Sequence, residues 1–352
     1  MKYLHIFNYD VNHKFSKDLV NLIENEIDNQ NHSYIQLISE ETSCINKDFS
    51  KLKPYHLSFK NFKSSKKLLK DYDKIFIHGL SDDIRILIFL AINKKLLKKS
   101  YWIIWGGDLY IHNSGKRNYK FHVKEILRKI IIKRFYGLIS QIKGDYDLAR
   151  EWYGAKGKYF YSFMYLSNTV KNLETNRSND TNSLVIQVGN SACSTNLHKE
   201  VFTMLEKYSE RTFDIVCPLS YAGNPQYINS VIEEGIKVFG ENRFRAITDF
   251  MSLEQYNNLQ AEVDIAIFNH RRQRGLGNII TLLGMGRKVY IRKDITTWSF
   301  AEEHGLTVYS IENDMDTLFH FDDKALNRNR VIIEKLFSKE KLVNDWKKIF
   351  EY

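Results

Sequence analysis

The stretch YWIIWGGDLY at residues 101–110 places an acidic residue, Asp108, where an apolar run ends in two glycines. A carboxylate held between apolar rings, such as those of Trp105 and Tyr110, has a raised pKa because burial disfavours its charged form. Such a group can act as a general base toward a hydroxyl. The alternative interpretation is that Asp108 caps a helix or accepts structural hydrogen bonds.

Three further polar residues, Asp10, His13 and His78, also follow predicted strands in the first half of the chain. In open α/β sheets the carboxyl ends of the strands line the ligand crevice, so we expect these residues near Asp108. They are predicted as neighbouring catalytic candidates. For His78, a core histidine with satisfied hydrogen bonds is the alternative.

A basic, glycine-containing loop follows the predicted strand that ends at Phe268, in the stretch IFNHRRQRGLGNII. Arginines, bare backbone and the positive end of a helix dipole together favour a diphosphate. The alternative is a solvated basic loop, and the pattern is not that of a P-loop. The donor-binding residues predicted in this loop are Arg272, Gln273, Arg274, Gly275, Gly277 and Asn278.

A second loop of small residues opens the second half of the chain, where Gly189, Asn190 and Ser191 follow the apolar run LVIQV. Small residues let backbone N–H groups approach a phosphate at a helix N-terminus, although an ordinary turn would have the same composition. Tyr221 and Tyr256 follow later in this half, and each could stack on a nucleobase or pack in the core.

Alternating strands and helices are predicted to position these loops. In the first half we predict strands at 2–8, 33–38, 74–78, 101–105, 136–140 and 158–161, with helices near 15–29, 81–97, 118–134 and 145–153. In the second half we predict strands at 184–188, 212–217, 263–268, 288–291 and 306–309, with helices near 195–210, 224–235, 252–261 and 277–286.

This pattern predicts an α/β protein with two Rossmann-like domains that face one another across a cleft. The polar stretch at 171–183 has no apolar periodicity, and we interpret it as the linker. The N-terminal domain then spans 1–170 and the C-terminal domain 184–327, with closing helices at 328–352.

The composition limits the class of protein. The chain has 352 residues and is 43% hydrophobic, which excludes disorder as a class. Its 3 cysteines lack metal-ligand spacing, so we expect a reducing compartment and no structural zinc. No apolar segment reaches the roughly 20 residues of a membrane span, and the N-terminus is not typical of a signal peptide.

The positive charge of the chain is concentrated in one region. The formal net charge is +10, and 14 lysines and arginines stand against 4 acidic residues between positions 94 and 150. This basic region is predicted to attract nucleic acid or an anionic membrane surface. Its helix at 118–134 mixes apolar and basic residues, so it could lie on an anionic leaflet or bury one face in its own core. No recognised nucleic-acid-binding module is present.

The motifs resemble those of a known family. HIFNYD, the IHG after the third strand, WIIWGGDLY, VGNS, the PLSY block and RQRGLGN follow one another between residues 3 and 290. This order is similar to the TDP-N-acetylfucosamine:lipid II N-acetylfucosaminyltransferase (4-alpha-L-fucosyltransferase-type) family. The resemblance implies a GT-B fold, with the acceptor site in the N-terminal domain and the nucleotide-sugar site in the C-terminal domain.

The resemblance also implies substrates and a location. It implies a TDP-sugar as donor and an undecaprenyl-diphosphate-linked glycan as acceptor. It also implies that the reaction takes place at the cytoplasmic side of the inner membrane, where we expect the basic 94–150 region to contact anionic lipid. It assigns the family's aspartate to Asp108 and the diphosphate block to Arg272, Gln273, Gly275 and Gly277. The sequence departs from the family at Arg274, where the family has glutamine, and at Gly107, where it has alanine.

We therefore expect a glycosyltransferase that moves a deoxy-acetamido sugar of the Fuc4NAc type, needs no cofactor or metal and binds no nucleic acid. The arginine-rich loop supplies positive charge that a metal would otherwise provide. One alternative is a GT-B transferase with a different nucleotide sugar or acceptor. The other is a non-catalytic basic protein that binds nucleic acid.

Overall fold

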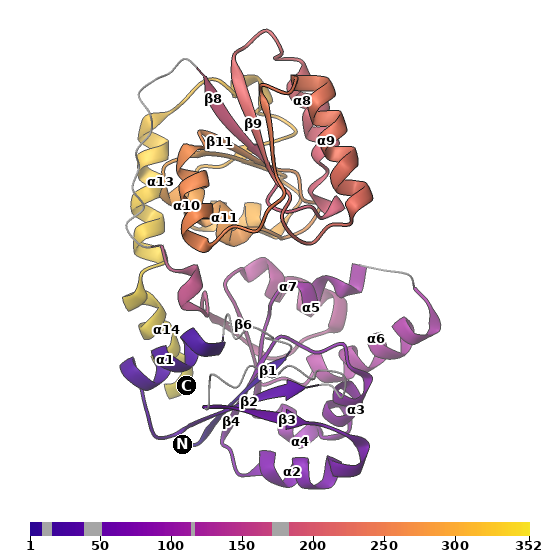
Figure 1. Cartoon of the computed structure of the whole chain (residues 1–352). Coiled ribbons are helices and arrows are strands. Elements are labelled where there is room, and N and C mark those ends of the chain that lie inside the picture. The colour runs from indigo at the N-terminus through magenta and orange to yellow at the C-terminus, as the bar shows by residue number, and fades with distance from the viewer. Residues whose placement is uncertain (9–15, 39–50, 114–116, 171–182) are drawn as a thin grey trace. The chain divides into compact units, whose positions relative to one another are not determined.

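The computed structural model describes residues 1–8, 16–38, 51–113, 117–170 and 183–352 (Figure 1). The chain divides into two compact units, which we call unit 1 (Met1–Thr169 with Phe337–Tyr352) and unit 2 (Val170–Leu336). Asp10, His13 and nearly all of the predicted linker lie outside the described residues.

Among its described residues, unit 1 contains a seven-stranded parallel sheet in the order β3-β2-β1-β4-β5-β6-β7. Its strands are β1 (Tyr3–Asn8), β2 (His32–Ile38), β3 (Leu52–His56), β4 (Lys74–His78), β5 (Ser100–Ile103), β6 (Gly137–Ser140) and β7 (Lys158–Tyr161). Its helices are α1 (Ser16–Glu26), α2 (Phe62–Lys70), α3 (Ile84–Ile92), α4 (Lys94–Leu97), α5 (Gly107–Tyr110), α6 (Tyr119–Ile132), α7 (Lys143–Tyr153) and α14 (Lys339–Glu351). Every residue of β4, β5 and β6 is buried, as is typical of a parallel sheet covered on both faces.

The described part of unit 2 contains a six-stranded parallel sheet in the order β10-β9-β8-β11-β12-β13. Its strands are β8 (Leu184–Val188), β9 (Phe213–Pro218), β10 (Phe244–Ile247), β11 (Ile265–Phe268), β12 (Lys288–Ile291) and β13 (Tyr309–Ser310). Its helices are α8 (His198–Glu206), α9 (Pro225–Phe239), α10 (Leu253–Glu262), α11 (Leu276–Gly284), α12 (Thr296–Glu303) and α13 (Asp323–Leu336).

Each sheet has one point where the strand order reverses, between β1 and β4 in unit 1 and between β8 and β11 in unit 2. At these points Phe7 pairs with His78, and Val188 pairs with Ile267. The paired strands therefore end at the same level. In α/β proteins this is where the loops separate and a ligand crevice opens.

The last two helices belong to different units. In α13, the Asn329 side chain donates to the Thr307 carbonyl at 2.8 Å and accepts from its N–H at 2.7 Å, within unit 2. In unit 1, α14 lies beside α1 (Figure 1) and packs Trp346 and Phe350 against aromatic side chains of the sheet. The Lys74 ammonium donates to the Phe350 carbonyl at 2.7 Å, which satisfies the C-terminal end of α14.

The predicted α/β class with two Rossmann-like halves is confirmed, while the cleft between them stays a prediction. The prediction omits β3 and β10, which are both edge strands. Pro54 in β3 and Arg245 in β10 interrupt the apolar pattern, and edge positions tolerate proline and charge because one side of the strand is unpaired.

Candidate active site

The loop between β11 and α11 has the geometry of an anion-binding helix N-terminus. Gly275 precedes α11 with a φ angle of +67°, and a Cβ atom at this position would lie 3.2 Å from the ring of the buried His270. Both the backbone conformation and the limited space therefore favour glycine. The first N–H groups of a helix have no partner within it, and the helix dipole favours an anion there.

The loop after β8 curls around the side chain of Asn196. The Asn190 N–H donates to Asn196 Oδ1 at 3.0 Å, and Asn196 Nδ2 donates to the Ser191 carbonyl at 3.0 Å. At Gly189 φ is +67°, and a Cβ atom would lie 2.7 Å from both Asn196 Oδ1 and His198 Nε2. A side chain at this position would therefore collide with the centre of the loop.

The loops after β8 and β11 lie in contact. A Cβ atom at Gly275 would be 3.3 Å from Asn190 Cγ. Arg274 reaches into the β8 loop and donates to Cys193 Sγ at 3.0 Å and to Thr195 Oγ1 at 3.1 Å. Burial raises the pKa of the Cys193 thiol, but the bonds from Thr195 and the charge of Arg274 outweigh it and lower the pKa overall. The structure thus brings predicted donor-binding residues of both loops together.

Tyr221 extends this cluster to the loop after β9. Its hydroxyl accepts a hydrogen bond from Asn190 Nδ2 at 2.9 Å, and its side chain is 51% exposed, which leaves a ring face open for stacking. The Asn190 Oδ1 atom is buried and has no hydrogen-bond partner among the described residues. A buried acceptor without a partner is uncommon in folded proteins, so a ligand donor such as a hydroxyl or an N–H group would fit here.

The remaining predicted donor residues lie on or near α11. The Tyr256 hydroxyl donates to Asn278 Oδ1 at 2.7 Å, so this tyrosine packs onto α11 and fixes its first turn, as in the packing alternative above. Arg272 and Gln273 are partly exposed in the loop, and Gly277 is exposed with open space where a Cβ atom would lie.

Sequence reasoning missed three residues that hold these loops, Asn196, Cys193 and His270. All three lie in the two strand-following loops already singled out. The only available signal was their position there, because a buried asparagine at a loop centre has no sequence pattern of its own.

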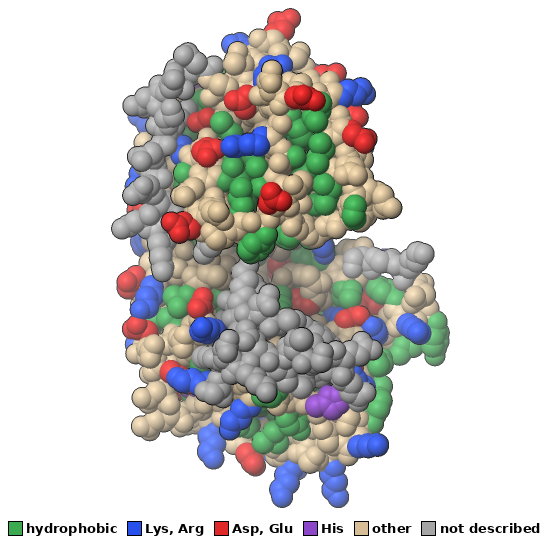
Figure 2. Space-filling model, viewed as in Figure 1, with side chains coloured by type: hydrophobic (Ala, Val, Ile, Leu, Met, Phe, Trp, Pro, Cys, Tyr) green, Lys and Arg blue, Asp and Glu red, His purple; other side chains and the backbone are tan. Residues whose placement is uncertain are grey.

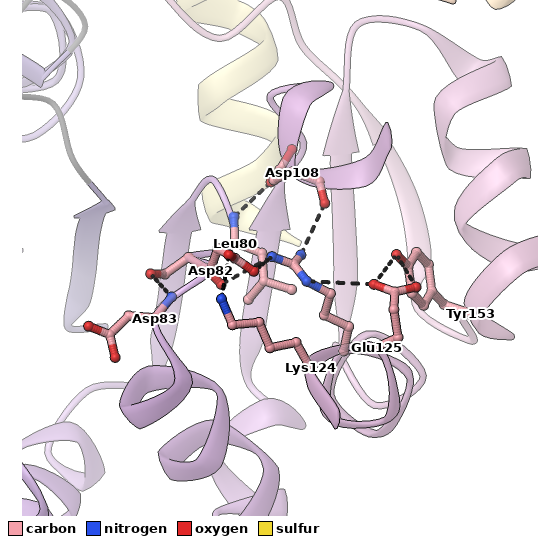
Figure 3. Close-up of polar contacts among 9 residues, drawn as sticks. Leu80, Asp82, Asp83, Asp108, Lys124, Glu125 and Tyr153 are labelled. Carbon is pink, nitrogen blue, oxygen red and sulfur yellow. Dashed lines mark hydrogen bonds and ion pairs between the residues drawn. The ribbon is translucent and has the colours of Figure 1, made fainter. Parts of the chain in front are cut away.

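In unit 1, Asp108 lies in the first turn of α5, just after β5 (Figure 3). Its Oδ2 accepts hydrogen bonds from the Leu80 N–H and the Trp102 indole N–H, both at 2.7 Å, and its Oδ1 accepts from the Trp105 N–H at 3.0 Å. The Arg128 guanidinium donates to the Asp108 carbonyl at 3.1 Å. Asp108 therefore ties the loop after β4 to the turn after β5.

The environment of the Asp108 carboxyl group combines burial with positive charge. Burial raises its pKa, while the bonds from Leu80 and Trp102 and the charge of Arg128 oppose this rise. A carboxylate has about four acceptor positions, and described residues occupy three of them. The structural role given as the alternative is therefore present, and no described residue donates to the second acceptor position of Oδ1.

His78 is fully buried, and both of its ring nitrogens face partners. Nδ1 lies 2.8 Å from the Tyr165 hydroxyl, and Nε2 lies 3.1 Å from His5 Nδ1. His5 Nε2 lies 3.1 Å from His32 Nδ1, and we call His5, His32 and His78 the histidine chain. Burial lowers the pKa of all three, that of His32 to about 4. At 0% exposure, with both ring nitrogens facing protein partners, His78 has the environment of the core-histidine alternative.

The basic 94–150 region presents apolar as well as cationic side chains. α6 buries Ile131, Ile132 and Arg128, whereas Ile126 is 61% exposed and Tyr119 is 81% exposed. Figure 2 shows lysine and arginine side chains spread over unit 1 with apolar side chains between them. α6 thus packs one face into its own core and leaves large apolar groups on the surface. In the described ranges no helix is long and apolar enough to cross a membrane.

Comparisons with known proteins agree with this architecture. The family model described as 4-alpha-L-fucosyltransferase, glycosyl transferase group 56, matches residues 2–349. The solved structure of a glycosyltransferase from Rickettsia africae has 13% sequence identity and a TM-score of 0.68, over 99% of this chain and 97% of that chain. Anabaena HepE in complex with UDP has 11% identity and a TM-score of 0.71, over 100% of both chains.

A third solved structure, sucrose-phosphate synthase from Thermosynechococcus elongatus, has 10% identity and a TM-score of 0.65, over 100% of this chain and 98% of that chain. At such identities the likeness shows the fold alone. The fold is GT-B, as predicted from the sequence.

Proposed function

The chain belongs to the 4-alpha-L-fucosyltransferase family, glycosyl transferase group 56, and from this membership we propose that it transfers a Fuc4NAc-type sugar from a TDP-sugar to an undecaprenyl-diphosphate-linked glycan. The reaction would serve the synthesis of a bacterial surface polysaccharide at the cytoplasmic side of the inner membrane. The observation that carries the proposal is the contact between the β8 and β11 loops around Asn190 and Gly275.

Unit 2 holds the donor in this proposal. The diphosphate lies at the N-terminus of α11, where Arg272 and Arg274 and the first N–H groups offset the charge that develops as the nucleoside diphosphate leaves. The half-exposed ring of Tyr221 stacks on the nucleobase. Anabaena HepE, which shares the fold, has been solved with UDP, which supports a nucleoside diphosphate as the ligand class. The positive charge of the loop makes a metal unnecessary in this scheme.

Unit 1 binds the acceptor. Asp108 accepts the proton of the attacking hydroxyl at the remaining position on Oδ1, and its raised pKa suits a general base. The Leu80, Trp102 and Trp105 donors hold the carboxyl group in one orientation. An oriented base contributes more to catalysis than a mobile one, because the reacting atoms are already in place.

The surface of unit 1 brings the enzyme to its lipid-linked acceptor. Exposed apolar groups on α6, Tyr119 and Ile126, lie among lysines, a combination that favours an anionic leaflet. Each basic side chain near such a surface contributes roughly 1 kcal/mol at physiological salt. We propose peripheral attachment through this helix.

The test is a product analysis. The purified chain is incubated with a synthetic polyprenyl-diphosphate-linked glycan and a panel of TDP-, UDP- and GDP-sugars, and the products are identified by mass spectrometry. We expect one added deoxy-acetamidohexose with the TDP-sugar only. Transfer from a UDP- or GDP-sugar instead, or transfer to a soluble glycan only, would replace the donor or the acceptor in the proposal.

A transferase with a different sugar is the second candidate, favoured by the departures at Arg274 and Gly107. Thermal-shift measurements separate the candidates early, because a ligand stabilises the folded state that binds it. We expect TDP to raise the melting temperature more than UDP or GDP, and oligonucleotides to leave it unchanged. The non-catalytic alternative is not retained, because the family is one of enzymes.

A further inference from the structure

The imidazole of His270 connects the two loops of the donor site. His270 is fully buried, two residues after the end of β11. Its Nε2 lies 2.7 Å from Asn196 Oδ1 in the β8 loop, and its Nδ1 lies 3.2 Å from the Arg274 carbonyl oxygen in its own loop. A Cβ atom at Gly275, the N-cap residue of α11, would lie 3.2 Å from its Cε1. The residue therefore contacts both loops and lies next to the glycine before α11, where the diphosphate is expected.

The orientation of the Asn196 amide is fixed by its other partners. Its Nδ2 donates to the carbonyl oxygens of Ser191 and Cys193, both at 3.0 Å, and its Oδ1 accepts from the Asn190 N–H at 3.0 Å. The amide oxygen must therefore face His270. As a result, both nitrogens of the His270 ring point at oxygen atoms that can only accept.

A neutral imidazole carries one N–H and can satisfy only one of these oxygens, whereas an imidazolium carries two and satisfies both. We assign the single proton of the neutral ring to Nε2, which makes the shorter contact, to Asn196. Nδ1 then has no proton to donate to the Arg274 carbonyl oxygen, so the hydrogen bond to the loop before α11 is not formed. A second proton on His270 would complete it.

The groups around His270 explain why the second proton is absent without a ligand. Burial lowers the pKa of His270 to about 4; the contact with the Arg274 carbonyl opposes this, and the positive charges of Arg274 and Arg272 lower the pKa further. From α8, His198 is also buried with a pKa lowered to about 4, while Glu200 is bound to Asn269 and Arg271. A diphosphate above Gly275 would offset the arginine charges and favour the imidazolium.

We propose that His270 is a positioning residue of the donor site, which becomes an imidazolium when a nucleoside diphosphate sugar binds and then joins the β8 and β11 loops through two hydrogen bonds. This inference rests on the proposed donor site. Donor binding then takes up one proton from solution, which passes to His270 Nδ1, and it is returned when the nucleoside diphosphate leaves. Donor affinity falls up to tenfold for each pH unit between the pKa of His270 in the free chain and its higher pKa in the complex, and it levels off above the latter.

The experiment is isothermal titration calorimetry of TDP-glucose binding at pH 7 in buffers of different ionisation enthalpy. TDP-glucose is chosen because its diphosphate diester has no terminal phosphate that titrates near pH 6. For the native chain we expect an uptake close to one proton. His270→Gln keeps an N–H toward Asn196 but cannot gain a second proton, so we expect no uptake and binding roughly ten- to hundredfold weaker, the range for a lost hydrogen bond to a charged group.

The matched control is His198→Gln, which replaces a buried histidine with a similarly lowered pKa that bonds to Tyr227 instead of the β11 loop. It should retain the proton uptake. Native binding without uptake, or uptake that persists in His270→Gln, overturns the role of His270 and leaves the donor site intact. No binding of TDP-glucose, TDP or UDP by the native chain overturns the donor site itself.

A second measurement does not depend on a folded variant. The imidazole carbon-bound proton of His270 is followed by NMR against pH, with and without TDP-glucose. We expect its titration to move from about pH 4 in the free chain to about pH 8 in the complex, because an uptake close to one proton at pH 7 requires a pKa above 7 in the bound state. An unchanged titration in a chain that binds TDP-glucose overturns the proposal.

Discussion

The substitution Asp108→Asn separates the catalytic role of this residue from its structural one. The amide keeps the shape of the carboxyl group but carries a single acceptor oxygen. If this oxygen takes the Oδ2 position, it retains the bonds from Leu80 and Trp102, and its NH₂ group then faces the Trp105 N–H. One hydrogen bond to a charged group is lost, and two donors face each other.

The magnitude follows from these contacts. A hydrogen bond to a charged group is worth about 1.5–3 kcal/mol. Part of this loss is offset, because burial already disfavours the charge of Asp108, as its raised pKa shows. We expect the free energy of unfolding to fall by about 1–2 kcal/mol, which leaves the protein folded. Loss of the base should reduce turnover by roughly 100- to 10,000-fold.

The assay compares three quantities in the variant: urea unfolding, initial rates with the lipid-linked acceptor, and TDP-sugar affinity by calorimetry. Donor affinity should be unchanged, because the donor loops lie in unit 2. The control is Asp82→Asn, which removes ion pairs of Lys124 and Arg128 from a half-exposed carboxylate and should cost at most about 1 kcal/mol. If the folded Asp108→Asn chain transfers sugar at near the native rate, Asp108 is only a structural acceptor.

The remaining predictions concern packing, pH, reactivity and the surface. Gly189→Ala places a Cβ atom 2.7 Å from two side-chain atoms and should lower the free energy of unfolding by about 1–3 kcal/mol in urea, whereas Gly277→Ala, with open space, should leave it unchanged. In the folded state the pKa values of the histidine chain lie below the unfolded value of about 6.5, so the unfolded state binds protons more readily. The stabilisation by the neutral histidines is therefore complete above pH 6.5 and should decrease as the pH falls toward 4. At pH 5 we expect the free energy of unfolding to be lower by roughly 2 kcal/mol for each fully buried histidine. An unfolding free energy that is equal at pH 7.5 and pH 5 would contradict a neutral chain. Alkylation of Cys193, followed by mass spectrometry, should slow when TDP is present, and equal rates would place TDP elsewhere. Ile126→Glu on α6 should weaken binding to anionic vesicles in a sedimentation assay without changing the thermal shift by TDP; unchanged sedimentation would exclude α6 as the contact.

The sequence predicted those features of the fold that repeat along the chain. Buried parallel strands give continuous apolar runs, so the interior strands could be found, and the order of strands and helices then implied two Rossmann-like halves. The strands β3 and β10 were missed because Pro54 and Arg245 interrupt their apolar runs, which an edge position tolerates. The edge strand β7, whose sequence is aromatic, was predicted.

The candidate site was predicted in part, because some of its residues are recognisable by their type and by their position after predicted strands. Glycines, arginines and an isolated aspartate after strands are visible in a sequence, and Gly189, Gly275 and Asp108 were found in this way. The partners that fix them could not be found, because they depend on contacts between distant segments. His270 lies 74 residues from Asn196 along the chain, and nothing local to either residue indicates the bond between them.

The return of α14 to unit 1 has a consequence for how the protein is made. A chain leaves the ribosome from its N-terminus, and domains commonly fold in that order. Here Trp346 and Phe350 cover a sheet residue of unit 1, and Lys74 can bond to the Phe350 carbonyl only after both sheets have been synthesised. Unit 2, whose last residue is Leu336, has all of its segments earlier. Unit 1 therefore gains its last element only after all of unit 2 has been synthesised, and its aromatic sheet face is uncovered until then.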